Sequence, residues 1–510
     1  MSQVWNLLTS KWSFFAGLIG QHLVISLSAI AIAILFGGAF GILISQYQKS
    51  AKPTLAVVNF LYTIPSISML GFLIPFSGIG NLTAVIALTI YALLPMVRNT
   101  YTAMTNVDPQ ILEAAKGMGS TRWQILTKIQ LPLAMPVIVS GIRSMVTMTI
   151  ALAGIASYIG AGGLGVAIYR GISTNDSAMT VAGSLLIAAL ALIIDAILGF
   201  AEKRMQLRTK KAKKTNRRLA QGAIALATIA LIAFFWPKKQ EESIHIATKP
   251  MTEQYILGAM LKDVIEQDTG IKVEITQGVG GGTSNIEPAL EKGDYDLYPE
   301  YTGTGWNMVL KKKSQYSEKM FDKLQAGYQK KGLTWQTMLG FNDTYGLAVR
   351  TAVAKKYGLK TYSDLAKLNG KLTLGAEPDF FGRADGYKLL QKTYGLTFKA
   401  TKDIDMGLKY QAISSGKVDV MPINTTDGQL AKAPVTVLKD DKEMYPSYEA
   451  GLVVRQDSLK KHPELGKALQ KLSGVLSEQE MSQLNYQVET KKEEPAAVAK
   501  AFLQKKGLIK

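Results

Sequence analysis

The stretch LVISLSAIAIAILFGGAFGILI, residues 23–44, contains no charged side chain and is long enough to cross a bilayer as one α-helix. Further apolar runs follow at about residues 55–75, 82–96, 133–159, 180–200 and 220–236. Glycine and proline inside such runs are tolerated where neighbouring helices satisfy the backbone. The first part of the sequence therefore predicts an α-helical polytopic membrane domain at 1–202, with a core of five helices.

Charge is distributed unevenly along the 510 residues. The chain has 58 Lys and Arg against 39 Asp and Glu, but residues 1–236 contain only 18 and 5 of these. The remainder has the composition of an ordinary soluble domain. Because the densest basic cluster lies between two apolar runs, we expect the lipid bilayer, and not nucleic acid, to be its partner.

Basic loops set the predicted orientation in the membrane. Lys and Arg follow the first and third spans, and nine more lie within 203–218 after the fifth. The positive-inside rule places these loops in the cytoplasm, so the N-terminus and everything after Trp236 are extracytoplasmic. We interpret 203–242 as a basic cytoplasmic linker and an uncleaved sixth membrane helix, because no small-residue cleavage pattern follows it. Sensing of anionic lipid or ionic strength is the alternative role for the linker.

Cysteine is absent from the chain. This excludes disulfides, thiolate metal sites, a cysteine nucleophile and a lipid-modified cysteine anchor. The apolar run at 220–236 is the expected tether instead. Two charged residues, Arg143 and Asp195, lie inside predicted spans, where charge is costly and often functional. We expect both side chains to extend to the cytoplasmic interface.

A spaced motif occupies the predicted cytoplasmic loop after the third span. Glu113, Ala114 and Ala115 are followed by Gly119 and, after nine further residues, by an Ile-Gln-Leu-Pro sequence that ends in Leu131 and Pro132. The alanines permit close contact and the glycine permits a tight turn.

The motif resembles the EAA loop of ABC importer permeases, and the resemblance covers about residues 15–210. It implies a coupling loop at 108–132 with a short helix, a turn and a second helix that together dock on an ATPase subunit. No G-x-x-x-x-G-K-[ST] pattern occurs in the chain, so a separate ABC ATPase is expected to hydrolyse ATP. Such permeases act in pairs, which implies a homodimer of the permease domain.

From residue 243 to 510 the pattern changes to short apolar strands that alternate with helical stretches. This predicts an extracytoplasmic α/β domain of the two-lobed type found in periplasmic binding proteins, because ligand sites favour the boundary between lobes. We expect one lobe at about 243–347 and 452–510, and the other at about 348–451.

Several motifs of this half resemble the binding proteins for glycine betaine, choline, carnitine and related osmoprotectants. They are KPMTEQ at 249–254, DLYPEYTGT at 296–304, FNDTY at 341–345, RADG at 383–386 and TTDG at 425–428. A quaternary ammonium group has no N–H to donate, but aromatic faces attract it. A ligand carboxylate requires donors such as Arg, Lys or a hydroxyl.

The resemblance implies a role for each matching residue. Tyr301, Tyr345 and Tyr448 fall where the family places its cage tyrosines, and Asp343 falls where a backbone carbonyl contacts the head group. At the carboxylate side, the matching residues are Arg383, Thr304 and Lys249.

One position departs from the family pattern. Asn424 stands where the family commonly has a fourth cage tyrosine, and an amide can donate and accept hydrogen bonds but offers no π face. A betaine with further polar groups would use this residue better than glycine betaine or choline. Ergothioneine, a trimethylated betaine with an imidazole-thione, fits that description, and some fused transporters import it. A simple osmolyte remains the alternative.

Two other functions compete with that of an importer subunit. A membrane-tethered sensor would need an output module, and a kinase, cyclase or coiled coil is not evident. An enzyme would need a reactive site, but the three histidines have no metal-ligand spacing and no nucleophile motif occurs. We therefore expect no cofactor, no metal and no enzymatic activity.

Overall fold

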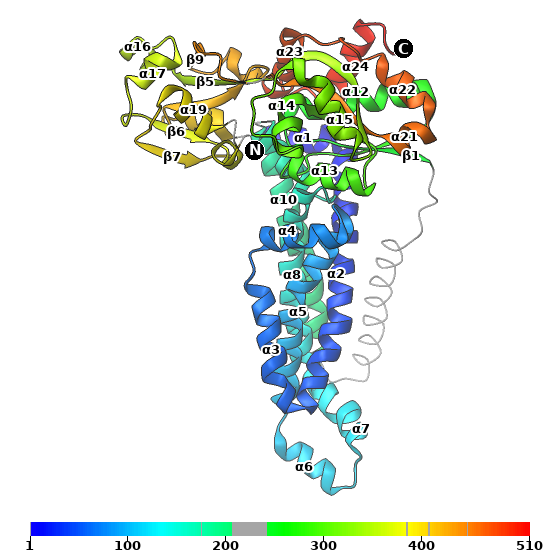
Figure 1. Ribbon diagram of the computed structural model, residues 1–510. Coiled ribbons are helices and arrows are strands. Elements are labelled where there is room, and N and C mark those ends of the chain that lie inside the picture. Colours follow the sequence, from blue (N-terminus) through cyan, green and yellow to red (C-terminus); the bar gives the residue numbers. More distant parts are fainter. Residues whose placement is uncertain (1, 175, 207–241, 384–385, 406–407, 446) are drawn as a thin grey trace. The chain divides into compact units, whose positions relative to one another are not determined.

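The computed structural model describes residues 2–174, 176–206, 242–383, 386–405, 408–445 and 447–510 (Figure 1). It divides into two compact units, residues 1–168 with 181–239 and residues 169–180 with 240–510. The predicted sixth membrane helix at 220–236 and most of the basic linker at 203–218 lie outside the described residues.

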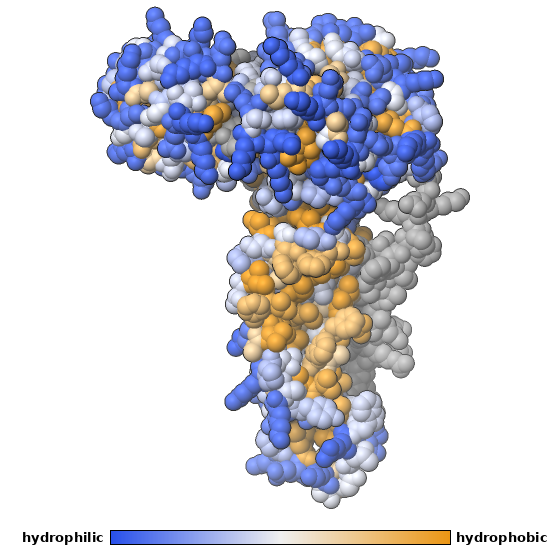
Figure 2. Space-filling model, in the orientation of Figure 1, coloured by the Kyte–Doolittle hydropathy of each residue, from blue (hydrophilic) through white to orange (hydrophobic). Residues whose placement is uncertain are grey.

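The N-terminal part of the chain is entirely helical where it is described. Its elements are α1 (Ser2–Ser10), α2 (Trp12–Gln46), α3 (Gln48–Thr63), α4 (Ser66–Ser77), α5 (Asn81–Thr105), α6 (Pro109–Gly117), α7 (Arg122–Ile125), the π-helix η1 (Leu126–Gln130), α8 (Leu131–Leu152), the 3-10 helix η2 (Ala153–Ile159), α9 (Gly165–Ser173) and α10 (Ser177–Gln206). Hydrophobic residues cover the middle of this helical unit (Figure 2).

Four helical segments among the described residues are long and apolar enough to span a membrane: Trp12–Gln46, Asn81–Thr105, Arg122–Ile159 and Ser177–Phe200. They contain four of the predicted spans. The fifth predicted span, at 55–75, is not one straight helix: α3 and α4 are long and apolar enough only when taken together, and they meet at a bend of 99°. The cause is Pro65: the residue before a proline avoids helical geometry, and Ile64 is extended, with ψ 127°.

Helices α2 and α5 pack closely because small residues lie at their contact (Figure 1). A Cβ atom added to Gly41 would lie 2.5 Å from the Cβ of Thr100 and 2.9 Å from the carbonyl oxygen of Val97. At Gly37, the same atom would lie 2.9 Å from the Met96 side chain. These glycines therefore set the distance between the two helices.

The charged residues inside the predicted spans pair with each other. Arg143 of α8 donates to both carboxylate oxygens of Asp195 in α10, at 2.7 and 2.6 Å, and Glu202 lies 3.3 Å from the same guanidinium. A two-bonded Arg–carboxylate pair satisfies both charges. The expectation that each side chain reaches the interface separately therefore missed this link between α8 and α10.

The C-terminal part contains two five-stranded mixed sheets with helices. The strands are β1 (Ser243–Ala247), β2 (Lys272–Thr276), β3 (Leu297–Tyr301), β4 (Leu333–Asn342), β5 (Tyr345–Arg350), β6 (Thr373–Ala376), β7 (Ala400–Asp403), β8 (Val420–Asn424), β9 (Val435–Leu438) and β10 (Glu449–Arg455). The helices are α12 (Thr252–Thr269), α13 (Thr283–Lys292), α14 (Thr302–Thr304), η3 (Gly305–Val309), η4 (Glu318–Met320), α15 (Phe321–Gln329), α16 (Thr351–Tyr357), α17 (Tyr362–Ala366), α18 (Pro378–Gly382), α19 (Tyr387–Tyr394), α20 (Lys409–Ser414), η6 (Gly428–Ala431), α21 (Gln456–Lys461), α22 (Pro463–Gln470), α23 (Glu478–Glu489) and α24 (Pro495–Lys505).

The two sheets have the same topology. The first has the order β2-β1-β3-β10-β4 and the second the order β7-β6-β8-β5-β9. In each, three neighbouring strands are parallel and the last two join antiparallel. The chain crosses between the sheets at Asp343–Thr344 and again between β9 and β10. We call the part around the first sheet lobe 1 and the part around the second sheet lobe 2.

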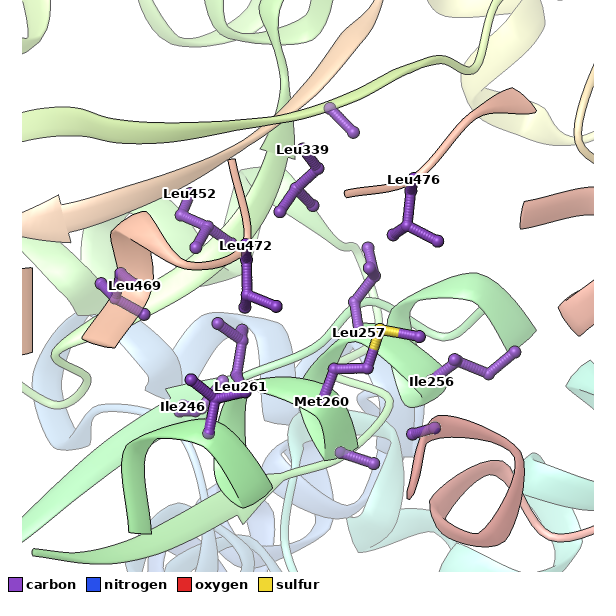
Figure 3. Packing of buried hydrophobic residues seen from close by; sticks show 14 of the residues in the cluster. Ile246, Ile256, Leu257, Met260, Leu261, Leu339, Leu452, Leu469, Leu472 and Leu476 are labelled. Atoms are coloured by element: carbon purple, nitrogen blue, oxygen red, sulfur yellow. The ribbon is translucent and has the colours of Figure 1, made fainter. Parts of the chain in front are cut away.

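Lobe 1 is held together by an apolar core under helix α12. Leu257 and Leu261 of α12 face Leu339 of β4 and Leu452 of β10, with Leu472 beside them, and all five are buried (Figure 3). Burial of side chains of this size contributes about 1.5–3 kcal/mol each. This core fixes the first turn of α12, and with it the position of Glu253, relative to the sheet.

The close α2–α5 contact gives a test of the membrane fold. Gly41→Ala is expected to destabilise the protein by about 1–3 kcal/mol, because the added methyl overlaps Thr100 and Val97. Gly17→Ala in the same helix is the control, since a Cβ there has nothing within 4 Å. Thermal unfolding of the full-length protein in detergent measures both; equal stabilities would contradict this view of the α2–α5 contact.

Candidate functional site

The central strands of the two sheets bring matching positions to the boundary between the lobes. β3 and β8 each begin after an aspartate, Asp296 and Asp419, and each has proline as its third residue. Both aspartates accept a backbone N–H from the neighbouring strand, at 2.8 and 2.9 Å. The strands end at Tyr301 and Asn424, so these two predicted site residues occupy equivalent places in the two lobes.

An aromatic cluster surrounds Tyr345, the first residue of β5. Its ring lies 5.7 Å from the ring of Tyr448 in an edge-to-face arrangement, and 5.9 and 5.8 Å from the rings of Phe380 and Tyr445. Tyr448 is buried, whereas Tyr345 is only partly buried. Tyr301 belongs to the same buried cluster as Tyr448, and Tyr345 packs against it. The structure therefore brings the three predicted cage tyrosines into one region.

Arg383 lies against this cluster. It follows α18, and its guanidinium carbon is 5.7 Å from the ring centre of Tyr345 and 6.0 Å from that of Tyr448. Its Nη1 also donates to the sulfur of Met308 at 3.0 Å. A cation within about 6 Å of an aromatic face is attracted to it. The tyrosine faces are therefore placed to hold a positive charge.

The second cation, Lys249, forms its contacts within lobe 1. Its ammonium pairs with Glu300 and lies 4.8 Å from the ring centre of Tyr301. Burial lowers the pKa of Lys249, and the opposing effect of Glu300 is smaller. The Tyr301 hydroxyl donates to Glu253. Thr304, predicted beside Lys249, is buried in the short helix α14.

Asp343, at the first crossing between the sheets, is the meeting point of several hydrogen bonds. Its carboxylate accepts from the Asn424 amide at 2.7 Å and from the Thr426 hydroxyl at 2.8 Å. Its backbone N–H donates to the carbonyl of Tyr448 at 3.1 Å. Burial and the nearby charge of Asp427 raise the pKa of Asp343 to about 6.

Asn424 is held in place on two sides. It lies opposite Tyr345 in the β5–β8 ladder, and its side-chain amide reaches Asp343. Its backbone N–H donates to Asp427 at 3.1 Å, and Asp427 also binds Lys409 at 2.7 Å. A polar cavity lies beside these groups and is lined by residues of both lobes, including Met251, Glu253, Asp343, Asn424, Thr426 and Lys409.

Several site residues were not predicted from the sequence. Phe380 and Tyr445 complete the surroundings of Tyr345, but a lone aromatic residue gives no signal in an α/β domain. Glu253 and Thr426 had a signal, because they belong to the KPMTEQ and TTDG motifs. Among the described residues, no group of three or more His, Cys, Asp or Glu is arranged to hold a metal ion.

The predicted coupling loop forms a helix, a turn and a second helix in the structure. Asp108 caps α6 by accepting the N–H of Gln110 at 2.9 Å, and Gly119 has φ +83°, which favours glycine. A reciprocal pair of bonds between Thr121 and Gln124 begins α7. Glu113 and Ala114 are exposed and Ala115 is buried; at the end of the loop, Leu131 is partly buried and Pro132 is exposed.

Two apolar side chains of this loop project into solvent and were missed by the sequence analysis. Met118 is 82% exposed and Trp123 is 70% exposed. Large exposed hydrophobic groups at one place often mark a binding surface for another protein.

Comparison with known proteins assigns both parts of the chain. Residues 242–505 match the family described as the substrate binding domain of ABC-type glycine betaine transport systems. Residues 29–207 match the binding-protein-dependent transport system inner membrane component.

Relatives match the whole chain and each part of it. The chain is 39% identical over 487 residues to the ergothioneine transport permease/ergothioneine binding protein EgtU of Helicobacter pylori, covering 94% of this chain and 88% of that protein. It is 38% identical over 269 residues to the carnitine transport binding protein OpuCC of Listeria monocytogenes, covering 52% and 87%. It is 42% identical over 212 residues to the carnitine transport permease protein OpuCB of Listeria monocytogenes, covering 42% and 92%.

These matches make the chain a membrane transporter subunit and not an enzyme, and they imply a partner ATPase and a small ligand. The chain belongs to the ABC importer family in which a binding-protein-dependent inner-membrane component and a substrate-binding domain of the glycine betaine type form one polypeptide.

Proposed function

We propose that this importer subunit binds and transports a betaine-type quaternary ammonium compound, and that the compound is ergothioneine. One observation carries the proposal: the tyrosine cluster around Tyr345 lies directly beside the hydrogen-bonded pair of Asp343 and Asn424. An aromatic face and a polar pair at adjacent positions suit a ligand with a trimethylammonium group and a polar ring.

The aromatic cluster supports the cationic half of the ligand. A trimethylammonium group has no N–H and cannot be recognised by hydrogen bonds. Its attraction to an aromatic face contributes about 2 kcal/mol or more once the ammonium group is desolvated. Tyr345 and Tyr448 already have the guanidinium of Arg383 beside their rings. A ligand ammonium can take over that position while Arg383 turns to the ligand carboxylate, for which its planar fork is well suited.

The polar pair supports the other half. The Asn424 amide donates to Asp343, so its carbonyl oxygen and the Asp343 carboxylate are acceptors for the ligand. The imidazole-thione ring of ergothioneine carries two N–H donors that match them. Glycine betaine has no such donor, and choline and carnitine each have a single hydroxyl. The EgtU relative, 39% identical, is named for ergothioneine.

The remaining assignments complete the proposed assembly. We assign residues 1–202 to the translocation pathway, 203–242 to a linker and membrane anchor, and 243–510 to an extracytoplasmic binding domain. Glu113, Ala114, Ala115, Gly119, Leu131 and Pro132 form the coupling loop, with Met118 and Trp123 as its exposed apolar contacts. Two copies of the permease domain pair, each with one ATPase chain.

The ligand assignment is tested by calorimetric titration of the full-length chain in lipid nanodiscs with ergothioneine, glycine betaine, choline and carnitine. Ergothioneine is expected to bind most tightly. Asn424→Ala should weaken the binding of ergothioneine by about 1–2 kcal/mol, because it removes a partly buried hydrogen-bonding group, and should change glycine betaine binding little. Tight binding of glycine betaine or carnitine without binding of ergothioneine would contradict the assignment.

The role of the aromatic cluster is tested at Tyr345. Tyr345→Leu is expected to weaken binding about 30-fold, corresponding to about 2 kcal/mol, because the aromatic face is lost. Tyr345→Phe keeps the face and should bind nearly as well as the unchanged chain. Tyr357→Leu, at an exposed tyrosine of lobe 2, is the control and should have no effect. The same titration measures all three, and equal losses for Leu and Phe would refute recognition by the ring.

The coupling loop is tested at Trp123. Trp123→Ser should abolish ligand-stimulated ATP hydrolysis in proteoliposomes that contain the ATPase subunit, because an apolar contact is lost at the docking surface. Trp123→Phe should retain much of the activity. Ligand affinity should stay unchanged in both variants. Normal stimulation by Trp123→Ser would rule out this surface as the docking site.

A further inference from the structure

A single hydroxyl group lies between two buried carboxyl groups at the boundary of the lobes. The Oγ1 atom of Thr426 is 2.7 Å from Oε2 of Glu253 and 2.8 Å from Oδ1 of Asp343. Glu253 is in the first turn of α12 in lobe 1, Thr426 follows β8 in lobe 2, and Asp343 lies at the crossing between them. All three side chains are buried.

This geometry requires a proton on one of the carboxyl groups. A threonine hydroxyl has one hydrogen, so it can donate to only one of the two oxygens. The second contact is a hydrogen bond only if that carboxyl group is protonated and donates to the threonine oxygen. Two ionised carboxylates around one hydroxyl would repel each other.

The surroundings identify Glu253 as the protonated group. Its other oxygen, Oε1, accepts the hydroxyl of Tyr301, and the Asn485 amide lies 3.5 Å from Oε2, the oxygen that faces Thr426. Burial, reinforced by the charge of Asp343, raises the pKa of Glu253 well above its usual value. Asp343, in contrast, is stabilised as an anion by the Asn424 amide and by the charge of Lys409.

We propose that Glu253 is held as a neutral carboxylic acid and is a positioning residue of the binding site. It donates to Thr426, which in turn donates to Asp343, so that the Asp343 carboxylate keeps one orientation toward the ligand. The effect on binding rests on the function proposed above, whereas the protonation of Glu253 does not. Loss of the proton places two negative charges around Thr426 and loosens Asp343, so affinity falls as the pH rises.

Other charged groups around Glu253 were considered because they also titrate. Tyr301 of β3 and Asp343 contact it directly or through Thr426. Asp427 and Lys409 form an ion pair on the far side of Asp343, and Lys249 is paired with Glu300. Glu489 of α23 lines the same cavity, and burial and Asp427 raise its pKa to about 7.

The positive end of helix α12 acts against the proposal, because it favours an anion at Glu253. This effect is weak compared with the cost of burying a second carboxylate beside Asp343. A glutamine side chain reproduces the neutral acid, with one oxygen to accept from Tyr301 and an N–H to donate to Thr426. Glu253→Gln is therefore the conservative variant, and Glu253→Ala removes both bonds.

The test measures the affinity for ergothioneine, with glycine betaine as a second probe, as a function of pH on the full-length chain in nanodiscs. The wild-type chain should lose affinity as the pH rises above neutral, by up to about tenfold per pH unit. Glu253→Gln should bind as the unchanged chain does at neutral pH and lack this alkaline loss. Glu253→Ala should bind about tenfold or more weakly at every pH.

A measurement without ligand separates this inference from the proposed function. Infrared difference spectra at neutral pH should show the C=O stretching band of a protonated carboxylic acid that is lost in Glu253→Gln. Glu287→Gln is the control: Glu287 is a buried acid in α13 with a pKa raised by burial to about 8, and its replacement should keep the alkaline loss of affinity.

Each result has a definite meaning. Failure of both probes to bind the unchanged chain counts against the proposed function, while the lost infrared band still supports a neutral Glu253. Absence of that band change overturns the inference. So does a Glu253→Gln variant that binds as weakly as Glu253→Ala while thermal unfolding shows it to be folded, because Glu253 is then needed as an anion.

Discussion

The candidate site depends on the cost of burying Asp343 at the crossing between the two sheets. A buried carboxylate must be surrounded by donors, and here two come from lobe 2, the Asn424 amide and the Thr426 hydroxyl. The backbone N–H of Asp343 binds the carbonyl of Tyr448, so the same residue also fixes one ring of the aromatic cluster. The polar and the aromatic halves of the site are thus positioned by one residue.

Two cations of the chain already lie at the tyrosine faces proposed to bind the ligand. Arg383 lies beside the rings of Tyr345 and Tyr448, and Lys249 covers Tyr301 while it is paired with Glu300. On the function proposed above, a ligand ammonium that takes a tyrosine face displaces an existing cation–π contact, and a new contact between Arg383 and the ligand carboxylate offsets that loss.

Features that follow from composition or from a family resemblance could be predicted from the sequence. Contacts between residues that are distant in the sequence could not. Apolar length gave four of the membrane spans, but Pro65 breaks the span expected at 55–75. Arg143 and Asp195 are 52 residues apart, and nothing local indicates that they meet. In the binding domain the motifs supplied Tyr345, Tyr448 and Arg383. The contacts of Phe380 and Tyr445 with Tyr345 follow only from the packing within lobe 2, and the Glu253–Thr426 contact only from the meeting of the two lobes.

The similarity of the two lobes explains why Asn424 matters. No extended repeat is visible in the sequence, yet β3 and β8 occupy the same central place in their sheets, and each has an aspartate before it and a proline as its third residue. Their last residues are Tyr301 in lobe 1 and Asn424 in lobe 2. If both strands ended in aromatic residues, these would surround an ammonium group but would form few hydrogen bonds with the rest of the ligand. With an amide at the end of β8, a hydrogen-bonding group lies beside the ring of Tyr345 on the neighbouring strand. A site with two different sides can therefore distinguish betaines by the groups they carry beyond the trimethylammonium head.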